Sequence, residues 1–157
     1  MTTKPLTQKQ VLLKAASYCA YQERCHTEVA AKLAEWGFFG IDAQQVIIQL
    51  IEQNYLNEER FAKSFAGGKF RVKSWGRQKI IRELKIKKIS PYCIQQALQE
   101  IDEAEYELRL IELMTDKWAD LKKERSKLIR QQKVMRFAQS KGYEMDLIIP
   151  LIKKIEP

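Results

Sequence analysis

Apolar residues recur along the chain at positions i, i+3 and i+4, the spacing that places side chains on one side of an α-helix. Alternation of period two is nowhere sustained, and the 157 residues include only four prolines and six glycines. In the segment after Thr7, the apolar positions are Val11, Leu12, Ala15, Ala16 and Cys19. The pattern predicts an all-α protein, with Thr7 as the N-cap of its first helix.

One arrangement of apolar positions occurs three times, in residues 27–38, 78–89 and 132–143. Each copy follows a longer predicted helix and precedes a short apolar one, so we predict nine helices in three units. A repeat with a period near 50 residues is typical of stacked units, each too small to bury its apolar side alone. We expect an elongated, curved array of helix-turn-helix-like units that form one domain. The expected units are residues 1–54, 55–102 and 103–157.

A turn is expected after the second helix of each unit. Gly37 and Gly142 stand where a left-handed residue would end this helix. In the middle unit Lys88 takes that place, which indicates a turn that is built differently. Ser90 and Pro91 then begin a new helix, because proline is tolerated at the first helical position.

Charge is unevenly distributed along the chain, whose formal net charge is +8. Residues 69–88 hold nine basic side chains against Glu83 alone, and residues 122–141 hold eight against Glu124. Between the two basic blocks, residues 100–120 hold eight acidic side chains and two basic ones. Like charges three residues apart destabilise a helix, so the basic blocks favour an anionic partner, either nucleic-acid phosphate or an acidic protein surface.

The second predicted helix of the middle unit has an apolar side and a basic side. Its apolar side comprises Ile80, Ile81 and Leu84, and its basic side Lys79, Arg82 and Lys85. The basic side is expected to face solvent and to contact DNA or a protein partner. The full expected contact surface has two patches. The first is Lys69, Arg71, Lys73, Arg77, Lys79, Arg82 and Lys85, and the second is Lys122, Lys123, Arg125, Arg130, Lys133 and Arg136.

Aromatic residues have two interpretations, according to their neighbours. Those at helical spacing beside glycine or alanine are expected in the core. They are Trp36, Phe38, Phe39, Phe61 and Phe65. Phe70 and Trp75 instead alternate with basic residues, an arrangement that suits stacking on a base or a partner. Gly67 and Gly68 lack the Lys-Ser/Thr pair of a phosphate-binding loop and are interpreted as a helix break.

The remaining candidate chemistry is sparse. The three cysteines are odd in number and not closely paired, so they indicate neither a disulfide framework nor a zinc site. Cys25 and His26 point to different sides of a helix, and neither a metal nor a catalytic role is expected for them. No apolar run approaches the 18 or so residues that cross a bilayer, and residues 1–10 are too polar for a secretory signal. We expect a cytoplasmic monomer without a cofactor.

Most of the sequence, from about Val11 to Ile155, resembles a known family. Residues 55–62, 69–71 and 75–89 are similar to the central signature of the RecX regulatory proteins, which bind the bacterial recombinase RecA. Residues 22–33 resemble the first-repeat motif of that family, and the similarity is weakest in the third unit. The chain departs from the family pattern at Gln22 and Cys25, where Arg and Ser are frequent, and at Lys88, where Gly is frequent.

The resemblance implies a regulator without enzymatic activity. RecX proteins are three tandem three-helix repeats that lie in the groove of the RecA–DNA filament. They lower its ATPase and strand-exchange activities and favour net disassembly, and so act as negative modulators of homologous recombination and of the SOS response. The implied partners are the RecA filament and DNA, which we expect to be single-stranded and bound through its phosphates.

Two other classes of function were weighed against this one. A helix-turn-helix-like transcription regulator would also consist of three-helix units with basic helices. The basic residues here are mostly lysine, which suits phosphate better than base edges. A nuclease would need clustered carboxylates that bind magnesium, whereas the acidic residues of 100–120 are interpreted as a solvated helix side.

Overall fold

The computed structural model describes residues 4–155, which form nine α-helices and, in that range, no strand. Unit 1 contains α1 (Gln8–Tyr21), α2 (His26–Glu35) and α3 (Gly40–Glu52). Unit 2 contains α4 (Glu58–Lys73), α5 (Arg77–Ile86) and α6 (Pro91–Leu98). Unit 3 contains α7 (Glu103–Asp120), α8 (Lys127–Ser140) and α9 (Met145–Ile155). The predicted all-α fold of three three-helix units is confirmed.

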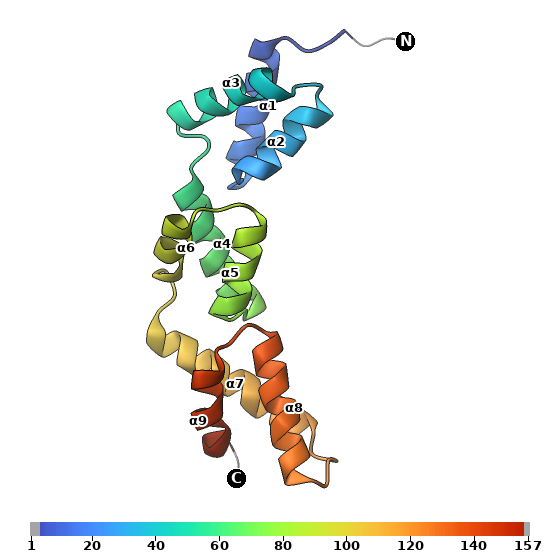
Figure 1. The fold of residues 1–157 in the computed structure, drawn as a ribbon, viewed down its shortest axis with the longest axis vertical. Coiled ribbons are helices and arrows are strands. Elements are labelled where there is room, and N and C mark those ends of the chain that lie inside the picture. The colour runs from blue at the N-terminus through green and yellow to red at the C-terminus, as the bar shows by residue number, and fades with distance from the viewer. Residues whose placement is uncertain (1–3, 156–157) are drawn as a thin grey trace.

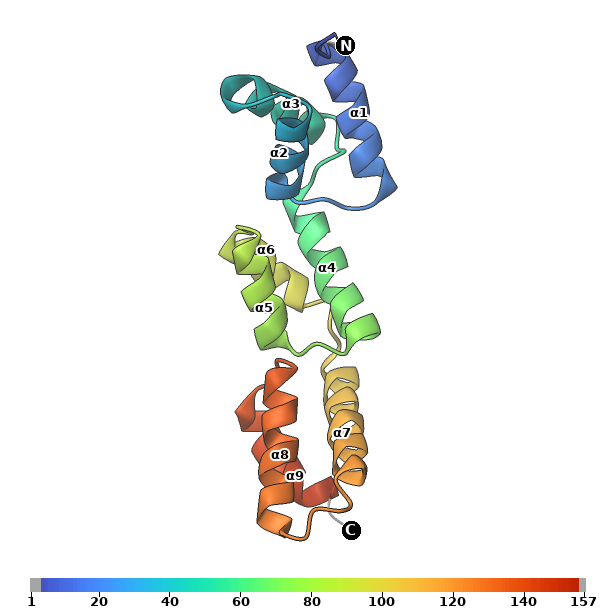
Figure 2. The ribbon, with the colours of Figure 1, turned by 90° about the vertical axis from the view of Figure 1, so that its right-hand side faces the viewer.

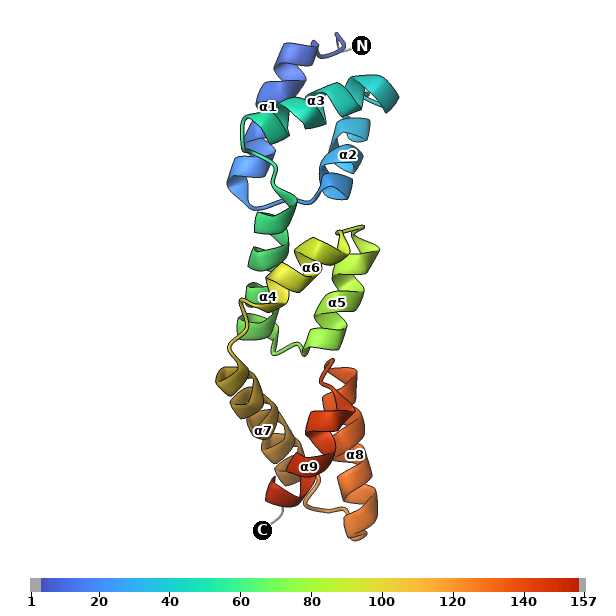
Figure 3. The same cartoon turned by 60° about the vertical axis from the view of Figure 1, so that its left-hand side comes forward.

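The three units are stacked end to end, so the molecule is elongated (Figure 1). The first helices, α1, α4 and α7, follow one edge of the rod, and the second helices, α2, α5 and α8, follow the other (Figure 2). The third helices, α3, α6 and α9, lie across one side of the rod, between these two edges (Figure 3). Each unit therefore has one side formed by its first and second helices alone.

The helix starts agree with the sequence-based expectations. The Thr7 side chain accepts a hydrogen bond from the backbone N–H of Gln10 at 3.2 Å, and the Gln10 side chain accepts one from the Thr7 N–H at 2.9 Å. This capping box satisfies two backbone donors that helix geometry leaves without a partner. Ser90 also caps α6, because its side chain accepts a hydrogen bond from the backbone N–H of Cys93, and Pro91 is at the first helical position.

The turn after the second helix is the same in all three units. Gly37, Lys88 and Gly142 have φ values of 87°, 61° and 103°. In each case the next residue donates its backbone N–H to the carbonyl five residues earlier, at 2.9, 3.1 and 3.2 Å. The expectation of a different turn at Lys88 was wrong, because a non-glycine residue adopts the left-handed conformation there.

Two other expectations were also wrong. Gly67 and Gly68 do not break the helix, because α4 continues through them. The buried side of α4 packs against α6, and this packing offsets the low helix propensity of two glycines. Phe39 is not a core residue, since it begins α3 as its N-cap and is 66% exposed.

The buried apolar side chains form two separate cores. The core of unit 1 comprises Val11, Ala15, Ala16, Cys19, Val29, Leu33, Ala43, Val46, Leu50 and Leu56. Units 2 and 3 share the second core, which is continuous from Phe61 to Ile152 and also includes Cys25. Units 2 and 3 are thus one packed body, whereas unit 1 is attached to it mainly through its linker and a few polar contacts. Within residues 4–155, none of the helices combines the length and the apolar character of a bilayer span.

Candidate nucleic-acid interface

The start of α5 is joined to the end of α8 through backbone hydrogen bonds. The Gly76 N–H donates to the carbonyl of Lys141 at 2.7 Å, and the Gln78 N–H donates to that of Gly142 at 2.9 Å. The hydroxyl of Tyr143, which is fully buried, donates to the carbonyl of Ser74 at 3.0 Å. These bonds set α5 and α8 nearly end to end on one edge of the rod (Figure 2).

A polar network around the buried Tyr106 side chain closes the same junction. The hydroxyl of Tyr106 accepts a hydrogen bond from the Arg77 N–H at 2.9 Å and donates one to the Glu144 carboxylate. The Arg77 guanidinium pairs with Glu144 at 3.0 Å and with Glu103. Burial, together with the hydrogen bond to Glu144, raises the pKa of Tyr106 far above its usual range. Arg77, which is in the first predicted patch, is only 18% exposed here and has its charge balanced by two carboxylates.

The basic side of α5 has the predicted orientation. Ile80 and Leu84 are fully buried, and Arg82 and Lys85 on the opposite side are exposed. Lys79 is half-buried, with its ammonium group 4.6 Å from the centre of the Trp75 ring. The three cations therefore lie along one solvent-facing surface.

The other members of the first patch lie in the last turns of α4 and do not share one surface. The Lys69 ammonium group lies 5.0 Å from the Trp75 ring, on the side of Lys79. Arg71 lines a groove with the acidic residues Glu105 and Glu112 of α7, away from α5. Lys73 is exposed in the last turn of α4. Only Lys69 is thus brought next to the basic side of α5.

Phe70 does not take part in this surface. It is 2% exposed, and its ring lies 5.8 Å from that of Tyr106 in the shared core. Of the two interpretations of Phe70, the core position holds and the stacking role does not, because the basic residues around it lie on other sides of α4. Trp75 is half-buried between α4 and α5 and remains accessible.

The second predicted patch is divided between a turn and a helix. Lys122, Lys123 and Arg125 are exposed in the turn between α7 and α8. Arg130 donates from Nε to the carbonyl of Trp118 at 2.9 Å, with its guanidinium 3.9 Å from that ring. Its planar group thus holds the two helices together.

Lys133 and Arg136 form the basic side of α8. The Lys133 ammonium donates to Glu124 at 3.1 Å, and this hydrogen bond lowers the pKa of the Glu124 carboxyl. Arg136 is exposed and lines a groove of about 350 Å³ with Phe137. Lys117 lies across this groove, with its ammonium group 5.0 Å from the Phe137 ring.

Lys133 and Arg136 occupy the positions in α8 that Lys79 and Arg82 occupy in α5, 54 residues earlier. The corresponding positions of α2, 51 residues before those of α5, are Glu28 and Ala31. Residues 1–54 contain five basic and five acidic side chains, so unit 1 is formally neutral. Equivalent basic helix sides are a property of units 2 and 3 only.

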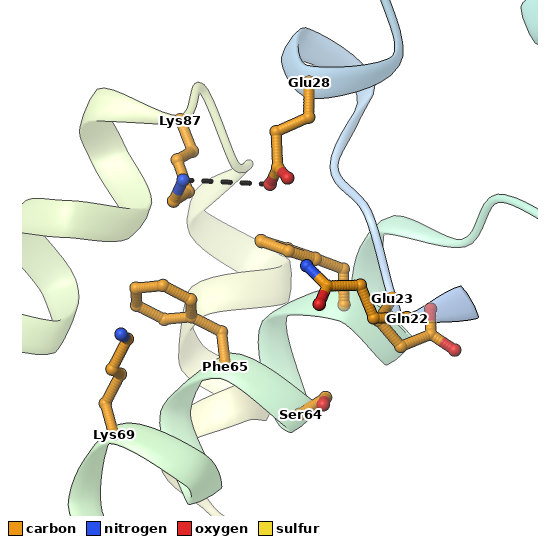
Figure 4. A pocket seen from close by; sticks show the side chains of 8 residues that line it. Gln22, Glu23, Glu28, Ser64, Phe65, Lys69 and Lys87 are labelled. Atoms are coloured by element: carbon orange, nitrogen blue, oxygen red, sulfur yellow. Dashed lines mark ion pairs between the residues drawn. The ribbon is translucent and has the colours of Figure 1, made fainter. Parts of the chain in front are cut away.

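A cavity of about 340 Å³ lies between units 1 and 2 (Figure 4). Phe65, Lys69 and Lys87 of unit 2 line it on one side, and Glu23 and Glu28 of unit 1 line it on the other. Lys87 pairs with Glu28 at 3.7 Å. Lys87 was not predicted as a contact residue, although it belongs to the first basic block. Phe65 was predicted in the core, and its ring is half-buried against that core.

The three cysteines lie in the two apolar cores. Cys19, Cys25 and Cys93 are free and buried. Burial raises the pKa of the Cys25 thiol, which hydrogen-bonds to Thr27 and Glu28. A protonated thiol is a poor nucleophile and a poor metal ligand. Among the described residues, no group of three or more His, Cys, Asp or Glu side chains is placed to hold a metal ion.

These features define a tandem helical-repeat protein in which two adjacent units carry equivalent basic surfaces. Family models for the second and third three-helix domains of RecX match residues 57–98 and 105–150. The chain belongs to the RecX family. The matched segments fall within units 2 and 3, where the basic surfaces lie.

Individual relatives agree with this assignment. A regulatory protein RecX of Clostridium perfringens is 34% identical over 129 residues, which cover 82% of this chain and 60% of that protein. Its counterpart from Acinetobacter baylyi is 28% identical over 137 residues, which cover 86% of this chain and 81% of that protein. The chain thus spans about 60% of the length of the Clostridium relative. These relatives are named as regulatory proteins and not as enzymes.

The fold is also that of solved structures. The crystal structure of RecX from Lactobacillus salivarius superposes with a TM-score of 0.84 at 21% sequence identity, covering 94% of this chain and 96% of that one. A second crystal structure of a regulatory protein RecX gives a TM-score of 0.81 at 20% identity. At this level of identity the likeness concerns the fold.

Proposed function

We propose that this protein binds RecA filaments assembled on DNA and lowers their ATPase and strand-exchange activities. Filaments then lose protomers faster than they gain them, and recombination and the SOS response are restrained. In this proposal the protein performs no covalent chemistry. Its effect comes from binding one conformational state of the filament more tightly than another.

The observation that carries the proposal is the repetition of one basic helix side in two firmly joined units. Lys79 and Arg82 of α5 recur as Lys133 and Arg136 of α8. An elongated body with two such surfaces can contact successive protomers, or the DNA between them, at the same time. Two weak contacts joined in this way bind far more tightly than either alone.

The test uses RecA from the same host on single-stranded DNA. Wild-type protein, added below the concentration of RecA, is expected to slow ATP hydrolysis and shorten the filaments. The variant K79E/R82E/K85E is expected to lose this effect, because it replaces attraction by repulsion at the proposed contact. Its helical circular dichroism should match that of the wild type, since these side chains lie on the solvent side of α5.

A matched control is K9E/K153E/K154E, which makes the same change in net charge at exposed positions of α1 and α9. It is expected to inhibit as well as the wild type. The proposal fails if wild-type protein leaves ATPase rate and filament length unchanged at equimolar RecA, or if both triple variants behave alike.

A further inference from the structure

Two aromatic rings meet between α4 and α5 of unit 2. The centres of the Phe65 and Trp75 rings are 6.2 Å apart, and their planes are inclined by 70°. Both side chains are half-buried, so each ring packs on the core with one part and presents another to solvent. Phe65 belongs to α4, and Trp75 lies in the connection between α4 and α5.

Three ammonium groups surround the two rings. That of Lys69 lies 5.5 Å from the Phe65 ring and 5.0 Å from the Trp75 ring. Lys79 approaches Trp75 to 4.6 Å, and Lys87 approaches Phe65 to 5.8 Å. Figure 4 shows Lys69 and Lys87 on either side of Phe65, at the cavity that this ring lines. The cluster therefore combines aromatic surface with a local excess of positive charge.

We propose that Phe65 and Trp75 form a stacking platform for the bases of single-stranded DNA, with the surrounding lysines on its phosphates. The inference rests on the proposed function in one respect, namely that DNA is a ligand of unit 2. Bases stack on aromatic rings whatever their sequence, and cations beside the rings neutralise the backbone that links those bases. A duplex hides its bases, so this cluster favours an unpaired strand.

The distribution of charge indicates where the phosphates lie. Glu23 and Glu28 belong to unit 1 and line the far side of the cavity. Lys79 is on α5 and does not line the cavity, and the ammonium group of Lys69 lies close to both rings, at 5.5 Å from Phe65 and 5.0 Å from Trp75. The phosphates are therefore expected along Lys69 and Lys79, and the cavity beside Phe65 is expected to receive a base.

Unit 3 has a related arrangement. Phe137 lies in a largely apolar groove between α7 and α8, rimmed by Lys117, Lys133 and Arg136. This groove, like the Phe65–Trp75 platform, lies between the first and second helices of its unit. Because α5 and α8 lie end to end, a strand that leaves the platform along α5 is led toward this second ring (Figure 2).

The test compares oligo(dT) with an abasic oligomer of equal length, which keeps every phosphate and lacks the bases. W75L is expected to weaken oligo(dT) binding about tenfold and to leave the binding of the abasic oligomer unchanged. F65L should act in the same direction, and W75F should restore most of the affinity. The matched control is W36L, because Trp36 has Lys14 at 4.8 Å and Lys32 at 5.9 Å but lies in neutral unit 1. W36L should bind both oligomers as the wild type does.

Tryptophan fluorescence provides a second readout. Oligo(dT) is expected to quench the emission of the wild type and of W36F, and to leave that of W75F unchanged. Helical circular dichroism and thermal melting of each variant show that the fold is intact.

Three results would overturn the platform. They are equal affinity of the wild type for the two oligomers, an equal loss for both in W75L, and no binding of either. A protein that binds neither oligomer but still slows RecA ATPase refutes the platform alone. A protein that binds oligo(dT) through Trp75 but leaves RecA unaffected refutes the proposed function alone.

Discussion

Gly76 and Gly142 approach each other so closely at the junction of units 2 and 3 that neither has room for a side chain. A Cβ atom on Gly76 would lie 2.3 Å from the carbonyl carbon of Gly142. A Cβ atom on Gly142 would lie 2.5 Å from the Cβ atom of Lys79. The backbone φ of Gly142 is +103°, which is unfavourable for residues with a side chain. The contact brings the start of α5 against the end of α8, where the backbone N–H groups of Gly76 and Gln78 donate to the carbonyls of Lys141 and Gly142.

Gly76→Ala is expected to destabilise the protein by about 2 kcal/mol or more, since backbone must move to admit the methyl group. Urea unfolding followed by circular dichroism measures the loss. Gly68→Ala is the control, because a Cβ there meets nothing within 4 Å in the middle of α4. It should raise the free energy of unfolding by about 0.5 to 1 kcal/mol. Equal stability of the two variants would show that the glycine contact is unimportant.

Tyr106 and Tyr143 should make stability depend on alkaline pH. Burial raises the pKa of both hydroxyls in the folded protein. A raised folded-state pKa favours folding fully below the unfolded value of about 10, and this contribution is lost as the pH rises above it. The urea midpoint should therefore fall between pH 9 and pH 11 or so.

The double variant Y106F/Y143F separates this effect from the deprotonation of lysines. It should be less stable at neutral pH, because Arg77 and Glu144 lose a buried partner, at a cost of about 1 to 3 kcal/mol. Above pH 9 its midpoint should fall less steeply than that of the wild type. Parallel curves for the two proteins would mean that the tyrosines do not govern alkaline unfolding.

Binding of single-stranded DNA should weaken steeply with salt. Each phosphate neutralised adds about 0.7 to the slope of log affinity against log salt concentration. R82E/K85E should reduce this slope by about one or more, and K153E/K154E should leave it unchanged. An affinity insensitive to salt, or a strong preference for one duplex sequence, would instead favour the transcription-regulator alternative.

Because unit 1 has its own core and units 2 and 3 share another, we expect removal of unit 1 to cost less stability than removal of unit 3. A fragment of residues 57–157 keeps the shared core of units 2 and 3 and should unfold cooperatively. It loses the ion pair between Arg60 and Glu23, at 2.6 Å, and the packing of Cys25. A fragment of residues 1–102 exposes the apolar surface that unit 2 buries against unit 3, and should be less stable than 57–157. Urea unfolding of both fragments tests this order, and the reverse order would contradict it.

Local sequence patterns were sufficient to predict the helices and some of their ends. Thr7, Ser90 and the two turn glycines act through residues three to five positions away, so their roles can be derived from spacing. The turn at Lys88 could not be derived, because its left-handed conformation is imposed on a residue that does not prefer it.

Contacts between distant residues account for what the sequence did not reveal. Arg77 was assigned to the binding surface by its place in a basic block, yet it pairs with Glu103 and Glu144, which are 26 and 67 positions away. For Phe70 the sequence left a stacking role open beside a core position because its neighbours in sequence are basic, whereas Tyr106 packs against it in the core. The orientation of Lys79 and Arg82 followed directly from helical periodicity, which is why the basic side of α5 was predicted correctly.

In the proposed function, the close contact of Gly76 and Gly142 would affect how long a partner remains bound. It holds Lys79 and Lys133 in one body, so a partner that escaped from one helix would still be within reach of the other. Such a partner would be recaptured before it could diffuse away, and complete release would require both contacts to open in the same brief interval. Two residues without side chains would thereby lengthen the residence time of a complex that they do not touch.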